Sequence, residues 1–300
     1  MSLNRAVRWG LSGFAAAVLT LAAPAAWAQE AADPNPGGVT LTSGFDVVST
    51  YMFRGIQQHS TGIAMWPYSD LGMALHSGMG GVKSVGLNFG TWNSLHTGDT
   101  GTDSVAAGVG CACGKAWYES DFYATFGLGF GGGVGVGTTF TAYTSPNNGF
   151  STVKEIAFKV SDDDSALLGK AALKPYAVFG FEFDTAPGLG QADGGAKAGK
   201  YLELGVAPGY AGSKASLAVP VKVGLSMGDY YEHPLTGTDN KFGFFSLAGV
   251  VTVPLGGTTS FGAFNIHGGA EFQKLGETTK FFAGGDDKRG IYSIGFGWTY

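Results

Sequence analysis

The sequence predicts an all-β chain that closes into a transmembrane antiparallel up-and-down β-barrel of about 12 strands. Three observations carry this prediction. Apolar and polar residues alternate over many segments of strand length, the connections between the segments are alternately short and long, and the chain ends on an aromatic strand. Alternation with a period of two indicates a strand with one apolar face, and alternately short and long connections are typical of outer-membrane barrels.

The N-terminal segment has the composition of a secretory signal peptide. Two arginines precede an apolar stretch from Leu11 to Ala23, and small residues flank Trp27 before a predicted cleavage site after Ala28. The apolar stretch is too short to span a membrane as a helix. We therefore expect three parts: a signal peptide over residues 1–28, a flexible N-terminal segment over residues 29–40, and an outer-membrane β-barrel over residues 41–300.

The composition argues against a helical protein and against a nucleic-acid-binding one. The chain has 52 glycines, and glycine is unfavourable in helix interiors. Only 14% of the residues are charged, whereas about a quarter is typical of soluble domains. The predicted signal peptide holds two of the 18 basic residues and none of the 23 acidic ones, which leaves a net charge of −7. Nucleic acid is therefore not expected as a partner.

Twelve strands follow from the alternation. They are expected near residues 45–54, 71–75, 85–89, 121–130, 133–144, 153–160, 172–184, 200–210, 214–228, 242–254, 260–272 and 290–300. Two connections fit this pattern less well: the external one near residues 57–62 is brief, and the periplasmic one at 161–170 is long. Pro67, Pro175, Pro208 and Pro220 should mark bulges or rim positions, because proline lacks the N–H of a ladder hydrogen bond.

The last strand carries the most specific membrane signal. Its aromatic residues, Phe296, Trp298 and Tyr300, alternate with small and polar residues up to the C-terminus. This segment looks like the C-terminal targeting strand of outer-membrane barrels. We expect outer-membrane lipid to cover its aromatic face and the barrel-assembly machinery to recognise it, which places the protein in the cell outer membrane.

Charged side chains within the strands are expected to face the lumen, since Arg or Lys on the lipid face costs about 2–4 kcal/mol near the midplane. The candidates for shaping selectivity are Asp46, Arg54, Asp70, Glu119, Asp121, Glu182, Lys222 and Glu271. Acids outnumber bases, which would favour cations in a water-filled path. Arg54 is expected on the strand face of Asp46 and Thr50, either shaping permeation or forming a buried ion pair that fills the interior.

Three stretches of the chain carry a family resemblance. They are Asp46–Ile56 (DVVSTYMFRGI), Gly90–Ser94 and Tyr118–Tyr123, and they lie in roughly the first third of the mature chain. These stretches resemble the TorF-type porin family of Gram-negative bacteria, although His59 and Trp66 depart from the family pattern. The resemblance implies an outer-membrane barrel presumed to act as a porin, and it brings neither a substrate nor catalytic residues.

The expected function is a porin-like channel for passive diffusion of small hydrophilic solutes or ions, with no chemical step, cofactor or metal. One alternative is a barrel that only anchors ligand-binding or adhesive external loops. Another is an outer-membrane lipid hydrolase, which would need a nucleophile and a histidine at the lipid boundary. His267 is instead expected to point inward as a hydrogen-bonded histidine. The oligomeric state stays open.

Cys111 and Cys113 lie in a long predicted external loop, separated by one residue. The cell envelope permits disulfides, but bridging positions so close together is geometrically demanding. The two cysteines are therefore expected to form either a strained local disulfide or unpaired or intermolecular thiols. Without a nearby histidine they are weak candidates for a metal site.

Overall fold

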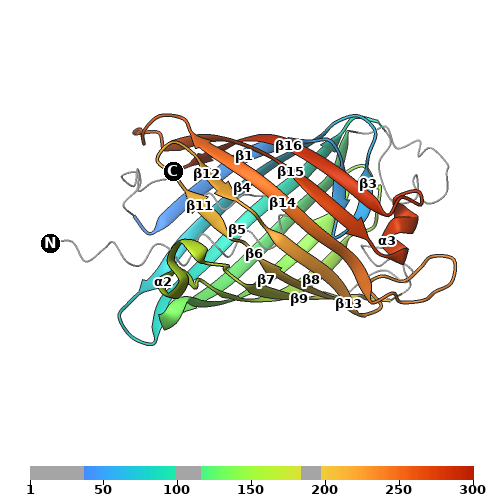
Figure 1. The fold of residues 1–300 in the computed structure, drawn as a ribbon, viewed down its shortest axis with the longest axis horizontal. Coiled ribbons are helices and arrows are strands. Elements are labelled where there is room, and N and C mark those ends of the chain that lie inside the picture. The colour runs from blue at the N-terminus through green and yellow to red at the C-terminus, as the bar shows by residue number, and fades with distance from the viewer. Residues whose placement is uncertain (1–36, 99–115, 184–196) are drawn as a thin grey trace.

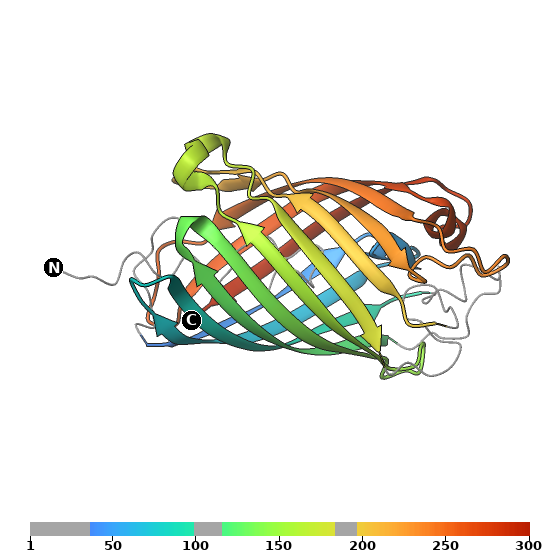
Figure 2. The ribbon, with the colours of Figure 1, turned by 90° about the horizontal axis from the view of Figure 1, so that it is seen from below.

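The computed structural model describes residues 37–98, 116–183 and 197–300. The strands of the wall are β1 (Val39–Val48), β4 (Ala64–Ser77), β5 (Val82–His96), β6 (Trp117–Phe130), β7 (Val134–Thr144), β8 (Val153–Asp162), β9 (Tyr176–Phe183), β10 (Lys200–Val206), β11 (Gly209–Ala211), β12 (Ser216–Ala218), β13 (Val221–Gly228), β14 (Phe242–Pro254), β15 (Ala263–Leu275) and β16 (Lys288–Thr299). They form the wall of one barrel (Figures 1 and 2). The predicted signal peptide over residues 1–28 lies outside the described residues, and β1 begins at Val39.

The barrel is closed and antiparallel throughout the described strands. They pair in the order β11-β12-β14-β13-β10-β9-β8-β7-β6-β5-β4-β1-β16-β15, and β15 pairs with β14 as well. β11 continues β10, and β12 leads into β13, so the described wall consists of 12 strands. The predicted fold class and strand number are confirmed.

The first and last strands form the seam that closes the sheet. Phe45 of β1 lies opposite Phe296 of β16 in the ladder. Beyond the ladder, Tyr300 N donates to Leu41 O at 2.8 Å and Leu41 N donates to Tyr300 O at 2.7 Å. Closure pairs the strand edges that would otherwise stay open to other chains.

The two faces of the wall differ in polarity. Large apolar side chains are exposed on the outside, among them Phe89, Phe122, Phe158, Leu247 and Ile294. The buried inner face carries polar and charged side chains, among them Asp46, Asn88, Thr139, Glu203 and Ser246. A closed sheet that is apolar outside and polar inside can satisfy its backbone within hydrocarbon. The chain is therefore an outer-membrane β-barrel.

The prediction that four prolines mark bulges or rim positions is wrong for Pro67, which lies within β4 opposite Phe45 of β1. Its missing N–H is tolerated there because the β4–β5 ladder does not pair Pro67. Pro175 directly precedes β9, and the other two prolines interrupt strands, as predicted. β10 ends before Pro208 and resumes as β11, whereas β12 ends before Pro220 and resumes as β13. Their carbonyls still take part in the sheet: Pro208 O accepts from Val219 N at 2.8 Å and Pro220 O accepts from Ala248 N at 2.9 Å. Each of these two prolines therefore sits at a break where its missing N–H leaves no gap in a continuous ladder.

The long connection between β8 and β9 conceals no additional strand. It contains α2 (Ser165–Leu168) and a 3₁₀ turn, η6 (Gly169–Ala171). Asp164, which precedes α2, accepts hydrogen bonds from Lys174 N through Oδ1 at 3.0 Å and from Leu173 N through Oδ2 at 3.1 Å. This loop therefore keeps the even strand count that the sequence predicted.

The two ends of the barrel differ in their connections. α2 and the C-terminus lie at one end, where β6 and β7 are joined only by the 3₁₀ turn η5 (Gly131–Gly133) (Figure 1). At the opposite end lies α3 (Glu277–Phe282). Since outer-membrane barrels have short turns in the periplasm and longer loops outside, the α3 end is the extracellular one.

The described helices are short. None of them combines the length and apolar character needed to cross a membrane.

The first predicted strand is wrong in its second half. β1 ends at Val48, and the chain then forms a separate two-stranded sheet of β2 (Tyr51–Phe53) and β3 (Ile56–His59). Arg54 and Gly55 join these strands, with φ of 48° and 83°. Two successive positive φ values are what a type I′ hairpin turn requires. Arg54 therefore occupies a turn rather than the wall.

Candidate functional site: a hairpin inside the barrel

The hairpin of β2 and β3 lies inside the extracellular half of the barrel. Every residue from Thr50 to His59 is buried, which cannot happen on a loop that points into solvent. Its neighbours come from strands on several sides of the wall, including β6, β8, β10 and β14. We call residues 50–59 the plug.

Arg54 at the tip of the plug is bound to Glu155 on β8. Arg54 Nη1 donates to Glu155 Oε2 at 2.6 Å, and Nη2 donates to Oε1 at 2.8 Å. The two side chains are 6% and 1% exposed, so the ion pair is shielded from solvent. Paired parallel hydrogen bonds of this kind are the strongest geometry available to an arginine and a carboxylate. Of the two interpretations left open for Arg54, the buried ion pair is the one that these contacts support.

Aromatic rings complete the surroundings of Arg54. Its Cζ lies 4.1 Å from the ring centroid of Tyr201 and 5.5 Å from that of Tyr230. Arg54 Nη1 also donates to Tyr230 Oη at 2.8 Å, while Tyr231 Oη donates to the carbonyl oxygen of Arg54 at 2.8 Å. A guanidinium held over aromatic faces gains cation–π attraction in addition to its hydrogen bonds. The tip is thus fixed through both its side chain and its backbone.

The two strands of the plug have further polar contacts with the wall. Tyr51 Oη donates to Glu119 Oε2 at 2.8 Å, and Tyr118 Oη donates to the plug's Gln58 Oε1 at 2.6 Å. On the other side, Arg289 Nε donates to Gln57 Oε1 at 2.8 Å. These hydrogen bonds tie both strands of the plug to β6 and β16.

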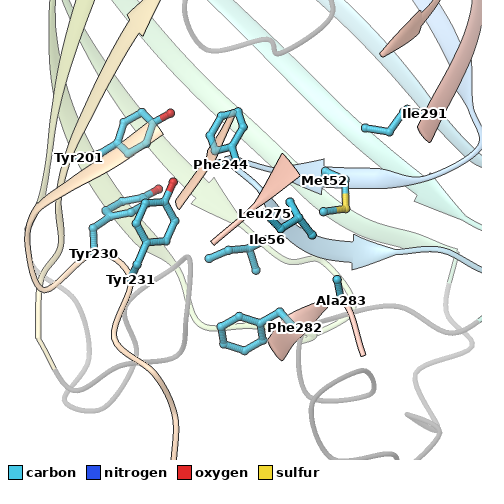
Figure 3. Packing of buried hydrophobic residues seen from close by; sticks show 10 residues of the cluster. All are labelled: Met52, Ile56, Tyr201, Tyr230, Tyr231, Phe244, Leu275, Phe282, Ala283 and Ile291. Carbon is cyan, nitrogen blue, oxygen red and sulfur yellow. The ribbon is translucent and has the colours of Figure 1, made fainter. Parts of the chain in front are cut away.

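Apolar packing fills the space around the plug. Figure 3 shows the cluster formed by Met52, Ile56, Tyr201, Tyr230, Tyr231, Phe244, Leu275, Phe282, Ala283 and Ile291. Ile56 of the plug is fully buried and lies between Phe282 of α3 and Leu275 of β15. The connection between β15 and β16 therefore folds back through α3 over the plug.

His59 ends the plug beside a second histidine. The ring centroids of His59 and His96 are 4.4 Å apart, and the ring of Tyr118 stacks on that of His96 at 4.9 Å. His59 Nε2 donates to Thr97 O at 2.9 Å, and His96 Nε2 lies 2.6 Å from Ser94 Oγ. The Nδ1 atoms of both histidines have no hydrogen-bond partner among the described residues.

Below the plug, polar networks line the periplasmic half of the lumen. His267 Nε2 lies 2.7 Å from Asp46 Oδ1, and His267 Nδ1 lies 2.9 Å from Asn265 Oδ1. Gly295 faces this group on β16, and a Cβ there would come within 2.3 Å of Asp46 Oδ1. The imidazole is therefore on the inner face and hydrogen-bonded, as expected, and away from the lipid boundary.

The other predicted lumen residues are distributed around the wall rather than gathered at one constriction. Asp70 Oδ1 accepts from Asn88 Nδ2, and Glu271 Oε1 accepts from Ser246 Oγ. Glu182 lies opposite Glu155 in the ladder of β8 and β9. The remaining three side chains, Glu119, Asp121 and Lys222, are also buried.

Sequence reasoning missed the partners of Arg54. Neither Tyr201 nor Tyr230 stood out, because an aromatic residue near the end of a strand is common in membrane barrels. The sequence did contain one signal for the plug. Arg54 and Gly55 follow the short apolar run of residues 51–53, and a glycine at such a position favours a turn. Cys111 and Cys113 lie outside the described residues. Among the described residues, no group of three or more potential metal-binding side chains occurs.

The comparisons with known proteins give no family assignment. No protein-family model matches the chain, and no curated protein matches it. Among solved structures, an outer-membrane channel from Pseudomonas putida F1 aligns with 89% of this chain and 97% of its own, at 12% identity and a TM-score of 0.48.

Two other solved structures are similar to a comparable degree. The NanC porin aligns with 87% of this chain and 98% of its own, at 13% identity and a TM-score of 0.40. Outer membrane phospholipase A from Escherichia coli aligns with 86% of this chain and 92% of its own, at 9% identity and a TM-score of 0.41. Because these scores are low, the assignment as an outer-membrane barrel rests on the closed strand pairing and the apolar outer face of this chain.

Proposed function

We propose that this chain is an outer-membrane channel for small hydrophilic solutes or ions, and that the plug is its closed gate. The observation that carries the proposal is the excess of carboxylates inside the barrel. Eight acidic side chains on the described strands are buried: Asp46, Asp70, Glu119, Asp121, Glu155, Glu182, Glu203 and Glu271. Only two lysine or arginine side chains, Arg54 and Lys222, are buried on the described strands and plug, together with three histidines, His59, His96 and His267.

This charge distribution would be unfavourable in an interior that contains no water. Moving an ionised carboxylate out of water costs several kcal/mol unless a partner compensates it. With so few bases within reach, water and mobile cations in the lumen are the simplest compensation. Water in the acid-lined lumen below the plug would then form the lower part of a cation-favouring path.

The construction of the plug supports a gating role. It is not a strand of the wall, so it can move without opening the sheet to lipid. It is held by side-chain hydrogen bonds, one ion pair and packing, all of which can be broken reversibly. A barrel of this size is intermediate between barrels filled by side chains and wide porins, so displacement of a short hairpin is enough to open a narrow path.

Single-channel recording of the refolded protein in planar bilayers tests the proposal. The wild-type protein should be mostly closed, with brief cation-favouring openings in a salt gradient. A variant in which a short Gly-Ser link replaces residues 50–59 should conduct continuously. Arg54→Ala should raise the open probability, and Lys241→Ala, which removes an exposed extracellular charge, should match the wild type.

Two results would contradict the proposal. One is the absence of any conductance in a folded variant that lacks the plug, which would favour a barrel that only anchors its external loops. The other is a preference for anions in that variant. Glu271→Gln removes a lumen carboxylate outside the plug and should reduce the cation preference of the open variant.

A further inference from the structure

The surroundings of Arg54 have the features of a receptor for an organic cation. Glu155 supplies two parallel acceptors at 2.6 and 2.8 Å, Tyr230 supplies a third acceptor at 2.8 Å, and Tyr201 supplies a ring face at 4.1 Å. All three side chains are 1% exposed. Planar, bidentate contact with a carboxylate combined with stacking on aromatic faces is how proteins recognise a guanidinium group.

The receptor belongs to the wall, whereas the cation arrives on the plug. Glu155 lies on β8, Tyr201 on β10, and Tyr230 follows β13, so these three groups are held in place by strands far from the plug in the sequence. Arg54 lies in the two-residue turn of the plug and reaches these three groups with its side chain. In this arrangement Arg54 acts as a tethered ligand of a site that exists without it.

The charge of the site requires a cation. Without Arg54, Glu155 would be a buried carboxylate beside Glu182, its neighbour across the ladder. The basic side chain Lys222 lies near Phe244, with its Nζ 5.6 Å from that ring, rather than at Glu155. Tyr143 Oη would still donate to Glu155 Oε1 at 3.4 Å, but no positive charge would remain beside the carboxylate. A desolvated carboxylate without a counter-charge is strongly unfavourable, so an emptied site should bind a suitable cation from solution.

We propose that Glu155, Tyr201 and Tyr230 form a binding site for solutes with a guanidinium group, which Arg54 occupies as an internal ligand in the closed state. External guanidinium solutes compete with Arg54 for the site and so favour release of the plug. The release of the plug by external solutes rests on the proposed function as a gated channel, whereas the binding site itself does not. Compact ammonium ions lack the planar fork and should bind more weakly.

The binding site is tested with Arg54→Ala protein refolded in detergent, using methylguanidinium chloride as the probe. Isothermal titration should show saturable binding in the millimolar range or tighter. Methylammonium chloride should bind at least about tenfold more weakly, because it cannot make the paired hydrogen bonds. Adding Glu155→Gln to Arg54→Ala should abolish the binding of methylguanidinium, and wild-type protein should bind it more weakly than Arg54→Ala does.

Equal binding of the two probes, or binding unchanged by Glu155→Gln, would overturn the proposal. If Arg54→Ala does not fold, Arg54→Asn provides a second emptied site, because its side chain is too short to reach Glu155 and tolerates the φ of 48° at this position. It is judged by the same criteria. The titration does not depend on conductance. Absence of binding therefore contradicts the proposed binding site and leaves the proposed channel function untouched. If binding occurs but methylguanidinium leaves wild-type open probability unchanged relative to potassium chloride, the competition with the gate is wrong and the site stands.

Discussion

The imidazole rings of His59 and His96 face each other in the extracellular half of the barrel, with their centroids 4.4 Å apart. His59 belongs to the plug and His96 to the wall, so this contact spans the moving and the fixed part of the proposed gate. The titratable groups that face the pair are the phenols of Tyr51 and Tyr118, and Tyr51 is itself hydrogen-bonded to Glu119.

We expect this ring contact to help hold the end of the plug against the wall. His59→Ala removes the ring that lies against His96 and the hydrogen bond to Thr97 O. Because both contacts stabilise only the closed state, the open probability of His59→Ala in single-channel recordings should be higher than that of the wild type.

His76 provides the matched control for this substitution. It lies on an exposed part of β4, so His76→Ala should retain the wild-type open probability. An unchanged open probability in His59→Ala would show that the histidine pair does not hold the plug in place.

Gly55 is a second position where one substitution should unseat the plug. Its φ of 83° is strained for any residue with a Cβ, at a cost of about 1–2 kcal/mol. A Cβ at this position would also lie 2.8 Å from Cβ of Phe244 on β14. Gly55→Ala should therefore increase the ratio of open to closed states by about tenfold or more in single-channel recordings.

Gly237 provides the matched control for this substitution. It also has a positive φ, of 63°, but a Cβ there would meet no atom within 4 Å. Gly237→Ala should strain an external loop without touching the plug, so its open probability should equal that of the wild type. If both alanine variants behave alike, steric contact with Phe244 is not what keeps Gly55 in place.

The strands of the wall could be predicted because the alternation of apolar and polar residues reflects the two environments of a barrel wall, lipid outside and lumen inside. Each wall strand presents one face to lipid, so residues such as Phe122 and Ile294 must alternate with small or polar ones. Pro208 and Pro220 were placed correctly for a similar reason, because the missing N–H constrains proline locally. Both signals act within a single segment and need no knowledge of the partner strands.

The plug could not be predicted by the same reasoning. Tyr51 and Phe53 continue the alternation of Phe45 and Val47, so nothing in the period marks Val48 as the end of a wall strand. The contact of Arg54 with Glu155 joins residues 101 positions apart, and it depends on the curvature of the whole barrel. Only the turn at Arg54 and Gly55 is a local signal. It indicates a hairpin, but it does not indicate whether the hairpin points into the barrel or out into solvent.

The seam between β1 and β16 gives a prediction about assembly. The backbones of Leu41 and Tyr300 exchange two hydrogen bonds, which lie beyond the last residue pair of the β1–β16 ladder. Deleting Tyr300 removes both bonds together with the terminal ring, whereas Tyr300→Ala removes only the ring. If backbone closure matters most, the deletion should lower the yield of folded barrel in outer membranes, measured by heat-modifiable mobility on gels, far more than Tyr300→Ala does.

The opposite result would support the role proposed for the C-terminal aromatic residues in targeting. In that case, Tyr300→Ala should be as defective as the deletion in cells. Both variants should then refold equally well in detergent, where no assembly machinery is present.

Asp164 makes the β8–β9 turn sensitive to pH. The backbone N–H groups of Lys174 and Leu173 donate to its carboxylate, and these hydrogen bonds, that of Lys174 first, lower the pKa of Asp164. A carboxyl group whose pKa is lower in the folded than in the unfolded state contributes stability above its unfolded pKa. This contribution is lost as the pH falls through the lowered, folded pKa.

We therefore expect Asp164→Asn to destabilise the barrel at pH 7 and to have progressively less effect as the pH falls below about 4, the ordinary value for Asp. Urea unfolding of liposome-inserted protein, followed by tryptophan fluorescence over this pH range, measures the difference in midpoint. Asp162→Asn removes a nearby carboxylate whose Oδ1 accepts no hydrogen bond from the described residues. Its midpoint at pH 7 should therefore lie closer to that of the wild type, and equal losses in the two variants would mean that the backbone hydrogen bonds to Asp164 are not the cause.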